Sequence, residues 1–268
     1  MNHRALQRAL FRAQLDPRFA ARVAAHEPEA LHSAGLGTEE LALLLAADPA
    51  ALAADRGGRR REQFLRNVAG EFALSLAATN GGALAAAFPE SDEFHAAVTA
   101  DASLPLAFAR HLEARTAGAS AAVRALVALE SALARLRREA SPPPRLASGE
   151  VALAPWARLH DAPAGTLALA AELRAGLDRG DSTPKSVHVS ETEREALLLR
   201  RAPETAPFRL PELELEALSP LLAELLGRAR KPLGPAARAA FARGAGVAPA
   251  ELEAVVAELV AEGVLAAG

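Results

Sequence analysis

Three consecutive prolines, Pro142–Pro144, divide the chain into two parts with different sequence patterns. Proline fixes φ and lacks a backbone N–H, so no regular helix continues through such a segment. Residues 1–140 show short stretches of helical periodicity rich in Ala, Leu and Arg, whereas residues 150–268 alternate short β-like runs with helices. The sequence therefore predicts a mainly α protein: an all-helical domain at 1–140, a Pro-rich linker at 141–149 and a smaller α+β domain at 150–268.

Two long helices are predicted in the helical domain, at about 59–78 and 120–138. In the first, large apolar residues recur at every fourth position, which is the pattern of an amphipathic helix with one buried face. These residues are Phe64, Val68, Phe72 and Leu76.

Glu130 falls on the apolar face of the second predicted helix, between Val127 and Leu133. Removing an unpaired carboxylate from water costs several kcal/mol, so a buried Glu130 needs a basic partner. We expect a structural ion pair with Arg66, on the other long helix. A catalytic acid is the alternative interpretation of the same position.

The α+β domain has β-like runs at 150–154, 186–189 and 195–201. The turn-like segment Ser190–Glu193 separates the last two, which predicts a β-hairpin. A further strand is expected at 208–210. The predicted helices of this domain cover 164–177, 213–227, 232–243 and 249–263.

Several kinds of chemistry are disfavoured by the residues present. The chain has no Cys, which excludes disulfides and thiolate sites, and its net charge of −3 gives no general attraction to nucleic acid or anionic membranes. His95 and His111 each lie two residues from a Glu, a spacing that places the side chains on different helix faces. There is no Gly-rich phosphate loop, nucleophile elbow, signal peptide or long apolar span. We therefore expect a cytoplasmic, non-catalytic chain with no metal or cofactor of its own.

The last three predicted helices, punctuated by Gly and Pro, suggest a helix-turn-helix. A DNA-binding transcriptional regulator is therefore an alternative function. The helix at 249–263, which would enter the major groove, contains four Glu and no basic residue. Phosphate repulsion disfavours that placement, so nucleic acid is not expected as a partner.

Five segments, in order, resemble the partner-protein family of multinuclear non-haem iron-dependent oxidases. The family includes the methanobactin-biosynthesis partner subunit, and its members are often labelled as DNA-binding domains. The segments are Phe64-Leu-Arg-Asn-Val-Ala-Gly-Glu-Phe-Ala-Leu-Ser-Leu76, Phe108-Ala-Arg-His-Leu-Glu113, Leu126-Val-Ala-Leu-Glu-Ser-Ala132, Leu153-Ala-Pro-Trp-Ala-Arg-Leu159 and Ala196-Leu-Leu-Leu-Arg200.

This resemblance implies a non-catalytic subunit that forms a heterodimer with an iron oxidase. Such a subunit binds the leader of a ribosomally synthesised precursor peptide and presents the precursor for modification during natural-product maturation. The iron would reside in the partner enzyme. The helical domain would dock that enzyme, and no nucleic acid or membrane would be involved.

A small sheet with a free edge can bind an extended peptide by adding it as another strand. We predict this edge at 186–189 or 195–201, where side chains alternate between apolar and polar. Arg200 and Arg201 would favour an acidic leader, and an internal strand without a free edge is the alternative. The expected peptide-binding residues are Val187, His188, Val189, Leu197, Leu199 and Arg200.

Overall fold

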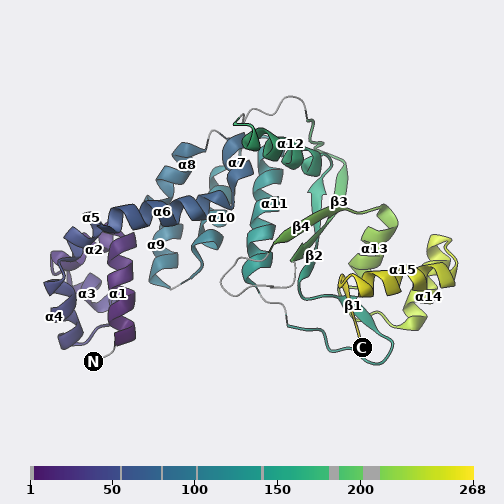
Figure 1. Cartoon of the computed structure of the whole chain (residues 1–268), viewed down its shortest axis with the longest axis horizontal. Coiled ribbons are helices and arrows are strands. Elements are labelled where there is room, and N and C mark those ends of the chain that lie inside the picture. The colour runs from purple at the N-terminus through teal and green to yellow at the C-terminus, as the bar shows by residue number, and fades with distance from the viewer. Residues whose placement is uncertain are drawn as a thin grey trace. The chain divides into compact units, whose positions relative to one another are not determined.

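The computed structural model describes residues 3–54, 56–79, 81–100, 102–139, 142–180, 187–201 and 212–268 (Figure 1). These residues form a mainly helical protein with a few short antiparallel strands, which confirms the predicted fold class. They divide into two compact units, Met1–Gly118 and Ala119–Gly268. Within the described segments, no helix combines the length and apolar character needed to cross a membrane.

In the first unit, the described residues form helices and no strands. The elements are α1 (His3–Leu15), α2 (Pro17–Ala24), α3 (Pro28–Ser33), α4 (Thr38–Ala46), α5 (Pro49–Ala54), α6 (Arg56–Gly70), α7 (Ala73–Ala78), α8 (Gly82–Ala87), η1 (Phe88–Glu90), α9 (Asp92–Thr99) and α10 (Leu104–Arg115).

Asp16 shows how the sequence breaks this unit into short helices. Its carboxylate accepts a hydrogen bond of 2.9 Å from the backbone N–H of Phe19 and so caps α2, while Pro17 occupies the first helical position. Its second oxygen lies 3.1 Å from Nδ1 of His95 on α9. One buried carboxylate thus caps one helix and contacts a second helix that is distant in sequence.

The predicted helix at 59–78 is two helices, because α6 ends at Gly70 and α7 begins at Ala73. Val68 and Phe72 are both buried, as the spacing of four predicts. Two turn residues reorient the chain between the helices, and Phe72 meets Phe108 edge-on at 5.3 Å between ring centroids.

The second unit combines helices and strands in the order α11 (Ala121–Arg138), β1 (Val151–Leu153), β2 (Ala157–Pro163), α12 (Thr166–Asp178), β3 (Arg194–Arg201), β4 (Leu213–Ala217), α13 (Pro220–Arg228), α14 (Pro235–Ala245), α15 (Pro249–Ala261) and β5 (Leu265–Ala267).

Strands β2, β3 and β4 form an antiparallel sheet with β3 in the centre. Residue pairs such as Leu199 with Leu215, and Leu198 with Glu216, fix its register. The predicted hairpin between 186–189 and 195–201 is therefore wrong, because β3 pairs with β2 and β4. Residues 187–190 form no strand, and the strand expected at 208–210 lies outside the described residues.

Helix α11 belongs to the second unit. It contacts β2, β3 and α12, and Figure 1 shows it beside the sheet, with α13 on the other side. The unit boundary therefore falls between Gly118 and Ala119, earlier than the predicted linker at 141–149. Helix α11 ends at Arg138, before the prolines, and the prolines do not separate it from the sheet that it covers.

The last three helices pack with a second, smaller ladder, in which β1 pairs with β5. Leu233, between α13 and α14, forms a bridge to Val151 of β1. Gly246, with φ of +69°, ends α14 and allows the turn into α15. Three helices occur here as predicted, except that residues 213–217 form β4 instead of opening the first of them. The helix-turn-helix likeness stays a prediction.

Candidate functional site

Strand β4 lies at one side of the three-stranded sheet, and its outer edge is open among the residues that the structure describes. Among the described residues, β4 pairs with β3 alone. The N–H of Leu218 donates to the carbonyl oxygen of Ala196, and hydrogen-bonded pairs alternate along an antiparallel ladder. The backbone groups of Glu214 and Glu216 therefore point toward β3, and those of Leu213, Leu215 and Ala217 point outward.

The opposite edge of the sheet is partly occupied. On β2, a guanidinium nitrogen of Arg230 donates to the carbonyl oxygen of Leu159 at 3.1 Å. Leu159 also lies near Gly227 on α13. An extended segment therefore has fewer free partners on β2 than on β4.

The two faces of β4 differ in chemistry. Leu213 and Leu215 are half-buried and share a face with Leu197 and Leu199 of β3, whereas Glu214 and Glu216 are exposed on the other face. Because successive side chains of a strand point to opposite faces, the sequence Leu-Glu-Leu-Glu-Ala gives β4 one apolar face and one acidic face.

An apolar groove of about 720 Å³ begins at the polar face of β4 and extends between α13 and α15. Leu221 at its mouth remains 37% exposed. The groove is lined by apolar side chains that include Leu198, Leu218, Leu221, Leu222, Val247 and Val255.

Carboxylates surround this apolar floor: Glu216, Glu251, Glu258 and Glu262 line the groove, and none of its lining residues is basic. Glu262 lies 3.9 Å from a guanidinium nitrogen of Arg200. For the other three carboxylates, no ion pair is formed with any residue that the structure describes. The groove thus combines apolar surface with unneutralised negative charge.

The predicted peptide-binding residues do not form one edge. Leu197 and Leu199 are fully buried in the central strand, whose two sides are both paired, so the free edge predicted at 195–201 is wrong. Arg200 forms a 2.6 Å ion pair with Glu214 of β4. It is therefore engaged within the unit.

Val187, His188 and Val189 lie together in the segment before β3, which is not a strand. Val189 is buried, Val187 is half-buried and His188 is exposed, so the alternation in burial is present without strand pairing. The carbonyl oxygen of His188 lies against Gly165, at the start of α12. These residues lie in the segment that leads into β3 and do not provide a free strand edge.

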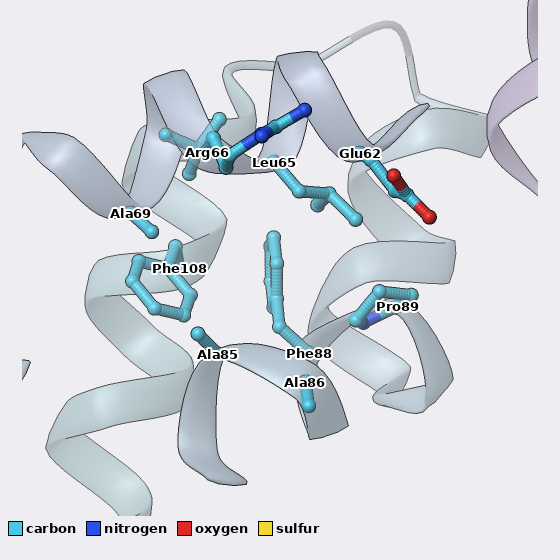
Figure 2. A pocket seen from close by; sticks show the side chains of 10 residues that line it. Glu62, Leu65, Arg66, Ala69, Ala85, Ala86, Phe88, Pro89 and Phe108 are labelled. Atoms are coloured by element: carbon cyan, nitrogen blue, oxygen red, sulfur yellow. The ribbon is translucent and has the colours of Figure 1, made fainter. Parts of the chain in front are cut away.

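Arg66 lines a pocket in the first unit, shown in Figure 2. The pocket has a volume of about 440 Å³, and Glu62, Leu65, Arg66 and Ala69 of α6 form one wall. The rings of Phe88 and Phe108, 4.8 Å apart, project into the space, while the charged ends of Glu62 and Arg66 point away from the rings.

Glu130 is 4% exposed, which confirms the predicted burial on α11. It belongs to the second unit and Arg66 to the first, so the proposed pair between them stays a prediction. Glu130 has an interaction partner in the structure, as a buried carboxylate requires.

A polar cavity of about 380 Å³ lies between α11 and β2 and contains His160, Asp161 and Arg194. Burial lowers the pKa of His160, and Arg194 binds the Asp161 carboxylate at 2.9 Å. In the described part of the chain, no three His, Asp or Glu side chains are grouped as metal ligands would be.

Comparison with models of known protein families and with curated protein sequences gave no match. The candidate site is therefore argued from its geometry: an open strand edge beside an apolar, acidic groove.

Sequence reasoning missed β4 because Leu213–Ala217 lies inside the helix predicted at 213–227. The alternation of Leu and Glu, followed by Ser219-Pro220, was the available signal.

Proposed function

We propose that this chain is a non-catalytic partner subunit in the cytoplasm. It binds the leader of a ribosomally synthesised precursor peptide and presents the precursor to a multinuclear iron-dependent oxidase. The observation that carries this proposal is the open edge of β4 beside the groove of the second unit. Main-chain groups of an edge strand bind extended peptides with little dependence on sequence, and a neighbouring groove adds selectivity.

The resemblance of five segments to the oxidase partner-protein family supports the same proposal, and it supplies the nature of the peptide and enzyme. We assign peptide binding to β4 and the groove, and no longer to Val187–Val189 and the residues of β3 that the sequence predicts. The first unit, with its aromatic pocket beside Arg66, is the proposed enzyme-docking part (Figure 2).

Reconstitution tests this function. The chain is combined with an iron oxidase and a precursor peptide encoded beside it, and the mass of the precursor is followed. We expect modification to require both this chain and the precursor's leader. Equal conversion by the oxidase alone would contradict the proposal.

The three-helix arrangement with a small ladder favours one second candidate, a DNA-binding regulator. Its recognition helix would be α15, which presents Glu251 and Glu258 on its groove-lining face. Three Glu on this helix, with Glu262 directly after it and no basic residue, oppose binding to phosphates. A gel-shift assay with random duplex DNA at low salt separates the candidates, and we expect no shift.

A further inference from the structure

We propose that the peptide bound along β4 is basic, with Lys or Arg alternating with apolar residues. This inference rests on the proposed function and specifies the class of leader that the site accepts. It differs from the acidic leader expected from Arg200 and Arg201.

The first argument is cross-strand pairing. An added strand would form its hydrogen bonds with the outward groups of Leu213, Leu215 and Ala217. Its side chains would then lie alternately beside Leu213 or Leu215 on one face and beside Glu214 or Glu216 on the other. Opposite charges that face each other across strands are favourable, and like charges are unfavourable. A strand of alternating apolar and basic residues therefore complements both faces of β4.

The second argument is the charge of the groove. The basic side chains of such a strand would lie on the same face as Glu216, where the groove begins. Glu251 and Glu258 on α15 line the same groove and have no ion pair among the described residues. An acidic peptide would bring more negative charge to this apolar, weakly screened surface, which is unfavourable.

The third argument concerns Arg200, the basic residue nearest to the groove in the predicted site. Its guanidinium lies 2.6 Å from Glu214 and 3.9 Å from Glu262. Its charge is therefore largely compensated within the unit. Binding an acidic leader there would require breaking these pairs.

The test uses the full chain and three labelled synthetic peptides of about ten residues. One alternates Lys with Val or Thr, the second replaces each Lys by Glu, and the third has the composition of the first with Lys in one block. Fluorescence anisotropy gives the affinities. We expect the alternating basic peptide to bind at least tenfold tighter than either other peptide. Equal or tighter binding of the acidic or the block peptide would overturn the inference.

Charge-reversal variants locate the effect. Glu216→Lys and Glu258→Lys should each weaken binding of the basic peptide by about three- to tenfold. The matched control is Glu39→Lys, which makes the same change in net charge at an exposed position of α4. Similar affinities for the groove variants and the control would overturn the assignment to this groove.

A backbone variant tests strand addition. The N–H of Ala217 points outward, so Ala217→Pro removes a donor for the added strand and leaves the β3–β4 ladder intact. Binding should fall about three- to tenfold while circular dichroism stays unchanged. If this variant unfolds, peptides N-methylated at alternate residues test the same bonds from the peptide side. Unchanged affinity for every methylation pattern would exclude strand addition.

Reconstitution and peptide binding can fail separately. If the oxidase works without this chain, the proposed function fails whatever the peptide results are. If the oxidase needs this chain but the peptides show no preference for alternating basic residues, only the inference about charge fails.

Discussion

His111 in α10 is a buried polar residue that is held by specific partners. Its side chain is fully buried, stacked on Phe108, and its Nε2 lies 3.1 Å from the carbonyl oxygen of Leu84. A guanidinium nitrogen of Arg115 donates to Nδ1 at 2.9 Å. This arrangement fits a neutral ring that donates through Nε2. Burial accordingly lowers the pKa of His111, an effect that the nearby Glu93 opposes.

This lowered pKa predicts an acid-sensitive stability. The unfolded chain, with the ordinary His pKa of 6.5, takes up a proton before the folded chain does as the pH falls. The stabilising contribution is thus fully present above pH 6.5 and is lost as the pH falls below it. Urea-unfolding midpoints measured between about pH 5 and pH 7.5 should show this decline.

His111→Phe should reduce the pH dependence, whatever its effect on stability at neutral pH. The control is His32→Gln, because His32 is exposed, and it should keep the full dependence. His160, whose pKa burial also lowers, would account for a residual slope. An identical slope in His111→Phe and the unmodified chain would contradict the assignment.

Glu130 gives a second prediction at this scale. Glu130→Ala should lower the free energy of unfolding by about 3 kcal/mol, because it removes a buried carboxylate and the interaction that this carboxylate makes. Glu62→Ala, which removes an exposed carboxylate on α6, is the control and should cost less than about 0.5 kcal/mol. Chemical denaturation measures both.

A double-mutant cycle with Arg66→Ala tests the predicted ion pair. A coupling energy above about 1 kcal/mol would support pairing of Arg66 with Glu130, and additive effects would exclude it.

At the scale of elements, local pattern predicted helices well and strand pairing poorly. The periodicity placed α11 and α12 within two residues of their observed bounds, because helical hydrogen bonds are local. The pairing of β3 with β2 and β4 joins residues far apart in sequence, and no periodicity contains that information. Val187 and Val189 are more buried than His188 between them, as in a strand, although this segment forms no strand. Local pattern cannot distinguish the two cases.

Gly165, directly before α12, allows the segment Val187–Val189 to approach the start of this helix closely. Its φ is +93°, and a Cβ placed there would come within 2.3 Å of the carbonyl oxygen of His188. Gly165→Ala should therefore destabilise the second unit by more than about 2 kcal/mol.

Gly180→Ala is the matched control. Gly180 also has a positive φ, +76°, but a Cβ there would meet no atom of the described residues within 4 Å. We expect a cost of about 1 kcal/mol from the backbone conformation alone. Equal losses in the two variants, measured by thermal unfolding, would show that the close approach to His188 is unimportant.

For the whole molecule, the position of α11 decides where the chain can be divided. The buried side chains of Leu197 and Leu199 lie on the face of β3 opposite Leu198, which packs with α13 and α15. Helix α11 contacts β2 and β3, so its removal exposes apolar surface of the sheet.

Two fragments test this division. Residues 119–268 should fold with cooperative thermal unfolding and dispersed amide resonances. Residues 141–268, cut at the prolines, should not fold, because they lack α11. A folded 141–268 fragment would show that α11 is dispensable for the sheet and would restore the boundary suggested by the sequence.

The open edge of β4 also determines how copies of this protein behave toward one another. Two β4 strands meeting antiparallel with Leu215 opposite Leu215 would place Glu214 of one copy opposite Glu216 of the other, on both sides of the centre. Such like charges oppose edge-to-edge association, a common protection of exposed strands. The carboxylates that select a basic peptide would thus also keep the protein from polymerising, and Glu214→Gln with Glu216→Gln should convert a partner-binding edge into a self-associating one.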